Sequence, residues 1–497
     1  ELGLILSIHD QGSGGMANVT KEIVTPCGAD IYLSEVSLGD KSMNDFEIWN
    51  SEYQEQVSVL VSARNLESCT LIAERENVPL DCVGCLNNSG SIRVFSKETK
   101  KEESEGEIVL NFNLNDIEEL PKQVINVKKE EITTEIIHLT QDVFDFVPIE
   151  PLEDLIKRIF TDVSVSSKRY LVHKVDRSVG GLVAQQQCIG PWNMPLADYS
   201  ISHINFFGYN GIATSFGERP ILGLLNINSM ITMSVGEMLT NLIFSGAEYN
   251  SIKCQGNWMW SVNHKNYNFL LYAAVEKLRR TLGTLGIGID GGKDSLSMNI
   301  KYNDQKIISP NSFVIKSYAK VVDTKIAVQP YFKGPNHDII YINLGKQSRR
   351  RMGGSVYFTK YDNISNDKQP EFDNKVIEVF KNFWDTIQGE MRNGNIYSGH
   401  DVSDGGLITS LIEMSIASFY GMTISIQSKI PHQRFLFNEE LGIILEFNPK
   451  FTENFIEFIN SVFPMIFAQR IGVTTFEPRV KVVYNTDFLM SQSNVEL

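Results

Sequence analysis

HDVSDGG, from His400 to Gly406, is matched near the other end of the chain by HDQGSGG, from His9 to Gly15. Each stretch is followed by a run with helical spacing, then by a β-like run, and then by an acidic motif before another β-like run. Because the same order recurs over so long a distance, the sequence indicates a duplicated domain rather than a short-period repeat. We therefore expect a protein built from two related halves.

The chain has 497 residues, a length that suggests about three domains. Its formal net charge of −15 argues against nucleic acid or an anionic membrane as a main partner, because both need clustered Lys and Arg. No apolar run is long enough for a membrane-spanning helix. The six cysteines are scattered, which fits a reducing compartment, and we expect a cytoplasmic protein. Cys82 and Cys85, in CVGC, are expected to be free thiols, since no second ligand pair for zinc follows them.

Short apolar runs alternate with runs of helical spacing along the whole chain, which predicts an α/β or α+β fold. We expect a buried strand at residues 1–10, and a chain that starts inside a strand suggests a piece of a longer protein. Residues 96–129 are polar and charged, and they are expected to connect two domains. Helices are expected at 151–160, 233–244 (amphipathic) and 270–285, β-like runs at 169–175 and 338–345, and a strand, Gly-rich turn and helix at 286–298.

Two polar patterns are compatible with a nucleotide and its metal ion. Glu237 and Asn241 are one helical turn apart and would share a face; both offer the oxygen ligands that Mg²⁺ takes, and Asp198 is a candidate third ligand. A solvated polar face is the alternative for the helical pair. The Gly-rich stretch 290–298 would let a phosphate approach the backbone, with Lys293 adding positive charge, although an ordinary Gly-rich turn fits as well. The two His-Asp pairs are more often structural hydrogen bonds than catalytic pairs.

Six longer motifs stand along the chain in this order: EIWNSEYQEQ, SVGGLVAQQQCIGPWNMPLADYSI, SVGEMLTNLIF, KCQGNWMW, GIDGGKDSLSM and GHDVSDGGL. They closely resemble the motifs of the large, single-chain phosphoribosylformylglycinamidine synthases, and the resemblance covers essentially the whole chain. It implies an α+β fold, the duplicated A/B two-domain scaffold of the aminoimidazole ribonucleotide synthase-like superfamily. It further implies that residues 1–118 end a first half (a B-type domain plus connector), that 119–330 form a second A-type domain and that 331–497 form a second B-type domain.

The resemblance implies ATP-dependent amidation of formylglycinamide ribonucleotide to formylglycinamidine ribonucleotide, a step of de novo purine biosynthesis that uses glutamine-derived ammonia. The implied ligands are Mg²⁺, ATP as a substrate and a structural ADP. The family's N-terminal domains and its glutaminase domain have no match here, so we expect them as partners and expect this chain alone to be inactive as a ligase. Two alternatives remain open: a catalytically silent homologue that acts as a scaffold or interaction protein, and a superfamily relative that acts on another substrate.

The same resemblance assigns residues to two nucleotide sites, although it assigns no catalytic residue within this chain. For the auxiliary ADP site it implies Asp198, Glu237, Asn241 and Asp401 as metal ligands, with Lys168, Ala197 and Ser403 near the nucleotide. For the catalytic site it implies Asp10 as a Mg²⁺ ligand, Glu52, Tyr53, Gln54 and Ser295 at the ribonucleotide, and Gly292 near ATP. Lys293 stands where shorter relatives carry an asparagine metal ligand, so it is expected beside phosphates instead.

Overall fold

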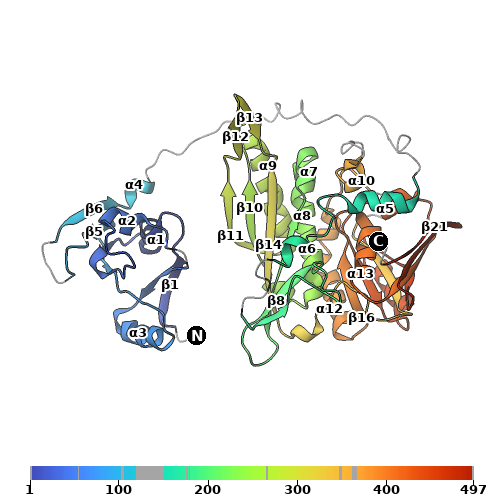
Figure 1. Cartoon of the computed structure of the whole chain (residues 1–497), viewed down its shortest axis with the longest axis horizontal. Helices are drawn as coiled ribbons and strands as arrows, with labels where there is room; N and C mark the ends of the chain where they lie inside the picture. Colours follow the sequence, from blue (N-terminus) through green and yellow to red (C-terminus); the bar gives the residue numbers. More distant parts are fainter. Residues whose placement is uncertain are drawn as a thin grey trace. The chain divides into compact units, whose positions relative to one another are not determined.

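The computed structural model describes residues 3–53, 55–101, 106–118, 150–174, 177, 180–264, 267–345, 350–360 and 367–494. The chain forms two compact units, unit 1 (Glu1–Ile125) and unit 2 (Asn126–Leu497) (Figure 1). Both units combine helices with mainly antiparallel sheets, which confirms the expected α+β class. The further division of the chain at residues 118 and 330 stays a prediction. Among the described helices, none is both long and apolar enough to cross a membrane.

Unit 1 contains two separate sheets. Its elements are β1 (Ile5–Asp10), α1 (Gly15–Val24), β2 (Ala29–Tyr32), α2 (Asp45–Asn50), β3 (Val57–Val61), α3 (Leu66–Arg75), β4 (Gly84–Leu86), β5 (Ser91–Phe95), β6 (Ile108–Asn113) and α4 (Asn115–Glu118). One sheet pairs β1 with β3, and the other has the order β4-β2-β5-β6. β6 and α4 fall within residues 96–129, so the expectation that this segment is only a connection is wrong as far as Glu118; residues 119–129 lie outside the described residues.

The core of unit 1 lies under the four-stranded sheet. Met16 and Val24 of α1 and Trp49 of α2 pack there against Ile31 and Val94 of the sheet. β1 is a strand, as expected, but the expectation that it is buried is wrong, because all of its residues are exposed. Its strand partner among the described residues is β3 alone, and α3 buries none of its side chains. The two-stranded sheet therefore contributes little to the core.

Unit 2 begins with a region dominated by a six-stranded sheet. Its elements are α5 (Leu152–Phe160), α6 (Arg169–Val172), β7 (Val183–Gln185), β8 (Tyr199–His203), β9 (Gly211–Glu218), α7 (Pro220–Leu225), α8 (Ile227–Leu242), β10 (Lys253–Met259), α9 (Tyr267–Leu285), β11 (Gly288–Ser295), β12 (Asn299–Tyr302), β13 (Gln305–Ile308) and β14 (Ser312–Val321). The sheet order is β11-β10-β14-β9-β8-β7, and α8 and α9 pack beside it (Figure 1).

A seven-stranded sheet follows in unit 2. Its elements are β15 (Asp338–Asn343), α10 (Val356–Thr359), α11 (Asn374–Ile377), α12 (Phe380–Arg392), β16 (Ile396–Asp401), α13 (Gly406–Ile416), β17 (Gly421–Ile426), α14 (His432–Leu436), β18 (Gly442–Phe447), α15 (Thr452–Val462), β19 (Phe467–Thr475), β20 (Arg479–Tyr484) and β21 (Asp487–Ser493). Short 3₁₀ turns complete the chain at Leu33–Glu35, Ala63–Asn65, Ile243–Ser245, Tyr249–Ser251 and Thr324–Ile326.

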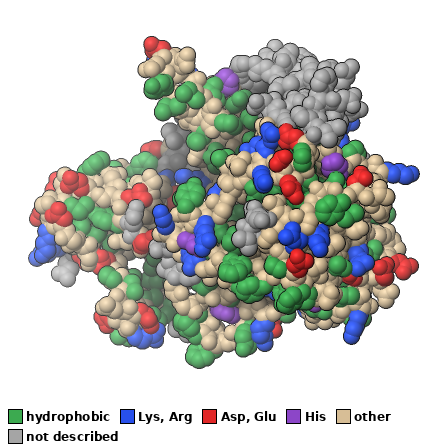
Figure 2. Space-filling view, turned by 45° about the vertical axis from the view of Figure 1, so that its right-hand side comes forward, with side chains coloured by type: hydrophobic (Ala, Val, Ile, Leu, Met, Phe, Trp, Pro, Cys, Tyr) green, Lys and Arg blue, Asp and Glu red, His purple; other side chains and the backbone are tan. Residues whose placement is uncertain are grey.

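The seven-stranded sheet has the order β16-β18-β15-β19-β17-β20-β21 and is covered on both faces. One core joins its β15 and β18 to α8, α9, α12 and α15, and a second core joins its other face to α5, α13 and α14. The central strands β15 and β18 are buried along their whole length, as expected for strands with helices on both sides. Figure 2 shows acidic and basic side chains interspersed over the face in view, with hydrophobic side chains between them.

Three expectations for single elements need correction. Residues 286–298 do not turn into a helix: β11 runs on to Ser295, held in register with β10, and β12 follows. Residues 169–175, expected as a β-like run, begin with the short helix α6. α8 confirms the helix expected at 233–244, but it is buried nearly all round rather than amphipathic, because it packs between β9, α9 and β16. The helices at 151–160 and 270–285 and the strand at 338 are confirmed as α5, α9 and β15.

The predicted duplication is confirmed by the geometry of the two His-Asp stretches. β1 pairs antiparallel with β3, with Asp10 opposite Val57, and β16 pairs antiparallel with β18, with Asp401 opposite Ile443. The helix after each stretch starts behind a left-handed glycine, Gly14 with φ 84° before α1 and Gly405 with φ 85° before α13. At these positive φ angles a side chain would be strained, so Gly is required at the same place in both copies.

Candidate metal and nucleotide site

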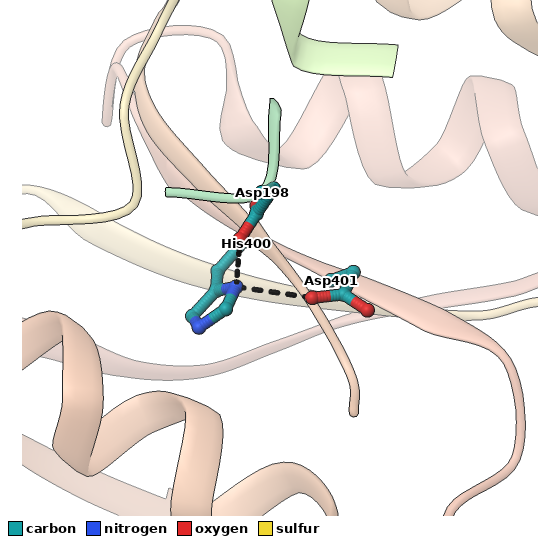
Figure 3. A group of neighbouring side chains, drawn as sticks. All are labelled: Asp198, His400 and Asp401. Carbon is teal, nitrogen blue, oxygen red and sulfur yellow. Dashed lines mark ion pairs between the residues drawn. The ribbon is translucent and has the colours of Figure 1, made fainter. Parts of the chain in front are cut away.

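Three side chains of unit 2 meet where β16 ends and β8 begins. His400 Nδ1 lies 3.0 Å from Asp198 Oδ1 and 3.2 Å from Asp401 Oδ1, as drawn in Figure 3. The three side chains are at most 5% exposed. Among the described residues, this is the one group of His, Cys, Asp and Glu side chains close enough together to hold a metal ion. We call it the Asp198–Asp401 group.

The sequence around HDVSDGG explains why these side chains are presented together. β16 is an edge strand of the seven-stranded sheet, and antiparallel pairing with β18 fixes His400 and Asp401 at its end. The chain then turns through Gly405 into α13, and Glu413 on that helix points back to place Oε2 3.4 Å from His400 Nε2. The imidazole is therefore held at both nitrogens by carboxylates.

The electrostatics of the group favour a protonated His400. The acidic side chains around it outnumber its single positive charge. Burial by itself would lower the pKa of His400, but Asp198, Asp401 and Glu413 outweigh it and hold this pKa well above its ordinary value. Burial, opposed by His400 and aided by Asp401, raises the pKa of Asp198 to about 6. One imidazolium thus faces three acidic side chains, two of which, Asp198 and Asp401, are almost completely buried.

The residues present fit a hard divalent cation. His400 forms ion pairs with Oδ1 of both aspartates. Oδ2 of Asp198 and Oδ2 of Asp401 are buried and accept no hydrogen bond from the described part of the chain. Buried carboxylate oxygens without a partner are costly, and Mg²⁺ prefers such oxygens as ligands. A protonated His400 cannot itself ligate a metal, so it would orient the two carboxylates.

A second charged group surrounds Arg219 at the start of α7. Its guanidinium lies 2.6 Å from Asp404, 3.1 Å from Glu237 and 3.6 Å from Glu439. Burial raises the pKa of Glu237 to about 8, with Asp401 and Asp404 adding to the effect and Arg219 opposing it. Burial likewise raises the pKa of Glu439 to about 8, again against the pull of Arg219. Because Asp401 contributes to the pKa of Glu237, the two charged groups belong to one electrostatic site.

The structure brings together part of the expected ligand set. Glu237 and Asn241 do share one face of α8, as predicted, and both reach β9: Glu237 Oε2 accepts from the Glu218 N–H at 2.7 Å and Asn241 Nδ2 donates to Phe216 O at 2.9 Å. Glu237 is also engaged by Arg219, so its oxygens are already partnered, unlike those of Asp198 and Asp401. Of the four expected ligands, Asp198 and Asp401 each keep a buried carboxylate oxygen without a hydrogen-bond partner among the described residues, whereas both oxygens of Glu237 are engaged.

A cavity of about 820 Å³ adjoins the Asp198–Asp401 group. It is lined by Glu413, which pairs with His400, and by Pro195 and Leu196, which lead directly into Ala197 and Asp198. Lys168 and Arg169 add positive charge to the wall, and Trp192 and Phe419 add two aromatic rings with centroids 5.3 Å apart. The volume is typical of small-molecule sites, which span about 300–1,000 Å³.

Of the three residues expected near the nucleotide, not all line this cavity. Lys168 is half-buried, and its ammonium group donates to Ser166 O, a neighbour on the cavity wall. The Ala197 N–H donates to Gln187 O at 3.2 Å and is therefore not free for a ligand. Ser403 lies in the turn between β16 and α13, where its N–H is 3.5 Å from Ser410 Oγ. Of the three, Lys168 is the one placed on the cavity wall.

Unit 1 repeats the His-carboxylate arrangement in exposed form. His9 Nδ1 lies 3.5 Å from Asp10 Oδ1, and His9 Nε2 lies 3.2 Å from Glu22 Oε2. His9 is therefore held by two carboxylates in the same way as His400, but Asp10 is 81% exposed, whereas Asp401 is 3% exposed. Within unit 1 no described residue takes the place of Asp198.

The other residues expected at a catalytic site are divided between the two units, and each unit is described here by itself. Glu52 is exposed and Tyr53, whose pKa burial raises, is half-buried in unit 1; Gln54 lies outside the described residues. Gly292, Lys293 and Ser295 lie on β11 in unit 2. Gly292 has a structural role there, since any side chain would meet Gly256 O of β10 at 2.0 Å. Lys293 is exposed on this edge strand.

Sequence reasoning missed the residues that surround the ligands. Glu413 had a readable signal, because Glu22 and Glu413 follow their histidines at the same spacing in the two copies of the repeat. Glu439 lies in the acidic motif that follows the second copy of the repeat, although no pattern linked it to Glu237, and Arg219 stands in no motif. Only the fold brings α7, α8 and the turn before β18 together.

The apo protein is expected to lose stability as the pH rises from about 5 to about 8. Glu237, Glu439 and Asp198 have folded-state pKa values above those of the unfolded chain, so the folded state binds more protons. The raised pKa of His400 acts in the same direction, since its stabilising charge is present at low pH and lost as the pH rises. Melting temperatures measured in EDTA across this range test the slope.

Glu237→Gln is the matched control for that pH dependence. A neutral amide of the same size cannot ionise, so the variant should show a shallower fall in melting temperature at high pH. A variant as steep as the unaltered protein, or a protein whose stability rises with pH, would contradict the assigned direction.

The chain is similar to known proteins in both sequence and fold. The sequence model of the AIR synthase related protein C-terminal domain matches twice, at residues 1–97 and 336–485, and that of the FGAR-AT PurM_N-like domain matches residues 167–320. The double match agrees with the duplication seen in the structure. Of the solved structures, T. maritima PurL complexed with ADP shares the fold, with a TM-score of 0.59 at 16% identity over 95% of this chain and 64% of that chain.

Curated proteins give a closer match. The phosphoribosylformylglycinamidine synthases of Dictyostelium discoideum and Homo sapiens are 36% and 34% identical to the chain, each over 459 aligned positions, and each alignment covers 89% of the chain. A similar protein of Arabidopsis thaliana, 35% identical over 96% of the chain, is named as probable and as chloroplastic/mitochondrial. The chain spans about a third of the length of these relatives, 33% for the first two and 34% for the third.

Proposed function

Because the chain belongs to the phosphoribosylformylglycinamidine synthase family, we propose that it is part of an ATP-dependent carbon–nitrogen ligase of purine biosynthesis. The intact enzyme would convert formylglycinamide ribonucleotide to formylglycinamidine ribonucleotide with ammonia derived from glutamine. Since this chain spans about a third of its curated relatives, the remaining parts of the reaction would depend on further domains of a longer protein. The cytoplasm stays the expected compartment.

Within this function, unit 2 is proposed to hold a structural ADP with Mg²⁺. The observation that carries the proposal is the pair of buried, unpartnered carboxylate oxygens of Asp198 and Asp401 beside a cavity of about 820 Å³. Buried carboxylate oxygens that lack a hydrogen-bond partner destabilise a fold. A cation that bridges the two oxygens would remove that cost. One structural relative, PurL, has been solved complexed with ADP, which agrees with a nucleotide as the second ligand.

The residues around the site would have different roles. His400, held at Nε2 by Glu413, would keep Asp198 and Asp401 aimed at the metal ion. Lys168 and Arg169 would face the phosphates, and Trp192 and Phe419 offer aromatic surface for a base. Bound Mg²⁺ would neutralise phosphate charge. Glu237 and Asn241 remain proposed ligands, which would require Glu237 to share its carboxylate between the metal ion and Arg219.

The residues proposed for the catalytic site form a less complete set. Asp10 would bind Mg²⁺, Glu52, Tyr53, Gln54 and Ser295 would contact the ribonucleotide, and Gly292 and Lys293 would lie near ATP. Support for Asp10 comes from the repeat, since His9 and Glu22 hold it in the way that His400 and Glu413 hold Asp401. Phosphoryl transfer to the amide oxygen of the substrate, followed by its displacement by ammonia, needs positioning and charge neutralisation rather than a strong nucleophile.

ADP together with Mg²⁺ is expected to raise the melting temperature of the chain. The chain alone is expected to show no ligase activity. A ligand that binds only the folded state stabilises it by mass action, by about 2.7 kcal/mol at a free concentration of 100 times Kd. Thermal unfolding should be followed with Mg²⁺ alone, with ADP in EDTA and with both. A shift that requires both supports the site; no shift in any condition contradicts it and favours the scaffold alternative.

A further inference from the structure

Another cavity of unit 2, of about 610 Å³, lies apart from the Asp198–Asp401 group. Three segments form its wall: the turn after α8 at residues 246–250, the turn after β14 within residues 322–326, and one face of α12. It shares no lining residue with the cavity beside the Asp198–Asp401 group. The proposed function therefore gives this second cavity no role.

The inner wall of the cavity is apolar and aromatic. Trp384 and Gln388 line it from α12, one helical turn apart. The ring of Trp384 is fully buried and lies 5.7 Å, centroid to centroid, from the ring of Tyr249. Its indole N–H donates to Ala247 O at 3.3 Å, so Trp384 keeps no free polar group. Trp384 thus fixes the Tyr249 ring as part of an apolar wall, which Ile326 extends.

Gln388 contributes a buried acceptor that has no partner in the described part of the chain. The side chain is 3% exposed, and its Nε2 donates to Ile243 O at 2.5 Å. Since Ile243 does not line the cavity, the amide nitrogen is turned toward the protein and the opposite atom, Oε1, toward the cavity. Oε1 is buried and accepts no hydrogen bond from a described residue. A buried acceptor of this kind needs a donor from a ligand or from a water molecule.

The rim of the cavity is charged, and one of its charges is unpaired. Three carboxylates on the rim each form an ion pair with a lysine: Glu248 with Lys320, Asp323 with Lys325 and Asp385 with Lys381. Arg392 is exposed on the same rim, and no described residue forms an ion pair with it. It follows Gln388 by one turn of α12, which separates their Cβ atoms by about 5–6 Å. A cation and an unused acceptor therefore stand next to each other on one helix face.

We infer that this cavity binds a small organic carboxylate that carries an N–H donor and an apolar ring. The N–H would donate to Gln388 Oε1, the carboxylate would pair with Arg392, and the ring would lie against Tyr249 and Ile326. A doubly charged phosphate fits less well, because three carboxylates share the rim. The volume lies within the range of small-molecule sites, about 300–1,000 Å³. The inference does not rest on the proposed function.

The test uses hippurate, which has a phenyl ring, an amide N–H and a carboxylate. Isothermal titration calorimetry measures its binding to the full chain, and amide hydrogen exchange locates the site. We expect slower exchange at residues 246–250 and 384–392 and no change in β18. N-methylhippurate lacks the donor and should bind about fivefold or more weakly. Hippuramide lacks the negative charge and should bind about tenfold or more weakly.

Arg392→Gln tests the protein side of the same contact without a change in the core, because Arg392 is exposed. The variant should bind hippurate about tenfold or more weakly, and it should no longer distinguish hippurate from hippuramide. Arg279→Gln is the matched control. Arg279 is an exposed arginine on α9 that does not line the cavity, so this variant should bind hippurate as the unaltered chain does.

The inference is overturned if hippurate does not bind measurably, or if the three compounds bind with equal affinity. Either result would mean that Gln388 Oε1 takes water only. Protection from exchange that lies outside the cavity would place the bound compound elsewhere. An Arg392→Gln variant that keeps full affinity would remove Arg392 as the partner of the carboxylate, and with it the assigned ligand class.

Discussion

Replacing Asp401 by asparagine is expected to weaken the binding of ADP with Mg²⁺ to the chain by at least about a hundredfold. Even partners that only orient a metal ligand contribute 10- to 100-fold to affinity, and Asp401 offers a buried, unpartnered oxygen of its own. Asparagine keeps the size of the side chain but removes the negative charge. His400 retains Asp198 and Glu413 as partners, so the fold around the site should persist. Competition against a fluorescent ADP analogue gives the affinity.

Asp10→Asn is the matched control for Asp401→Asn. Asp10 stands at the equivalent position of the repeat, beside its own histidine, but in unit 1 and with an exposed side chain. Its replacement should leave ADP affinity at the auxiliary site unchanged. Equal losses in the two variants would remove the assignment of the site to unit 2, and an unchanged Asp401→Asn variant would exclude Asp401 as a ligand.

Replacing Arg219 by methionine is expected to lower the free energy of unfolding by about 3–5 kcal/mol in the absence of nucleotide, the range found when one partner of a buried ion pair is removed. Methionine fills a similar length, but it leaves Glu237 and Glu439 without their cation in a buried place. Burial already raises the pKa of both carboxyl groups to about 8, so the loss should be largest above pH 8, where both carboxyl groups are ionised. Chemical denaturation in EDTA measures the change.

Arg279→Met is the surface control for this experiment. Arg279 makes two hydrogen bonds to Glu276, both of 2.9 Å, but it is 69% exposed, and exposed ion pairs contribute little to stability. Its removal should not change the unfolding curve measurably. The double variant Arg219→Met with Glu237→Gln should lose less than Arg219→Met alone, because the stranded charge is gone. If it loses as much, the cost does not come from the unpaired carboxylate.

The arrangement of the fold could largely be predicted from the sequence where a repeat or a long helical pattern was present. HDVSDGG and HDQGSGG revealed the duplication because both copies need the same left-handed glycine before a helix. Residues 286–298 misled the prediction, since Gly-rich sequence is typical of turns and only the register with β10 makes this segment a strand. The exposure of β1 could not be read either, because its apolar residues look like those of a strand with neighbours on both sides.

The expected metal ligands of the candidate site could be predicted from the sequence better than the residues that surround them. Asp198 was a candidate ligand from its residue type, Asp401 was added by the resemblance to a known family, and both lie beside His400 in the structure. Glu439 stood in the acidic motif of the repeat, but its contact with Arg219 could not be foreseen, because the two residues come from distant segments.

The most direct test of the central claim is a crystal structure of the chain with ADP and Mn²⁺, with the anomalous signal of manganese standing in for magnesium. A metal peak about 2.1 Å from Oδ2 of both Asp198 and Asp401, the distance expected for an ion of this size, with ADP phosphates on the same ion and its base in the cavity beside Trp192, is the predicted result. Nucleotide bound elsewhere, or a metal ion that avoids both aspartates, would contradict it.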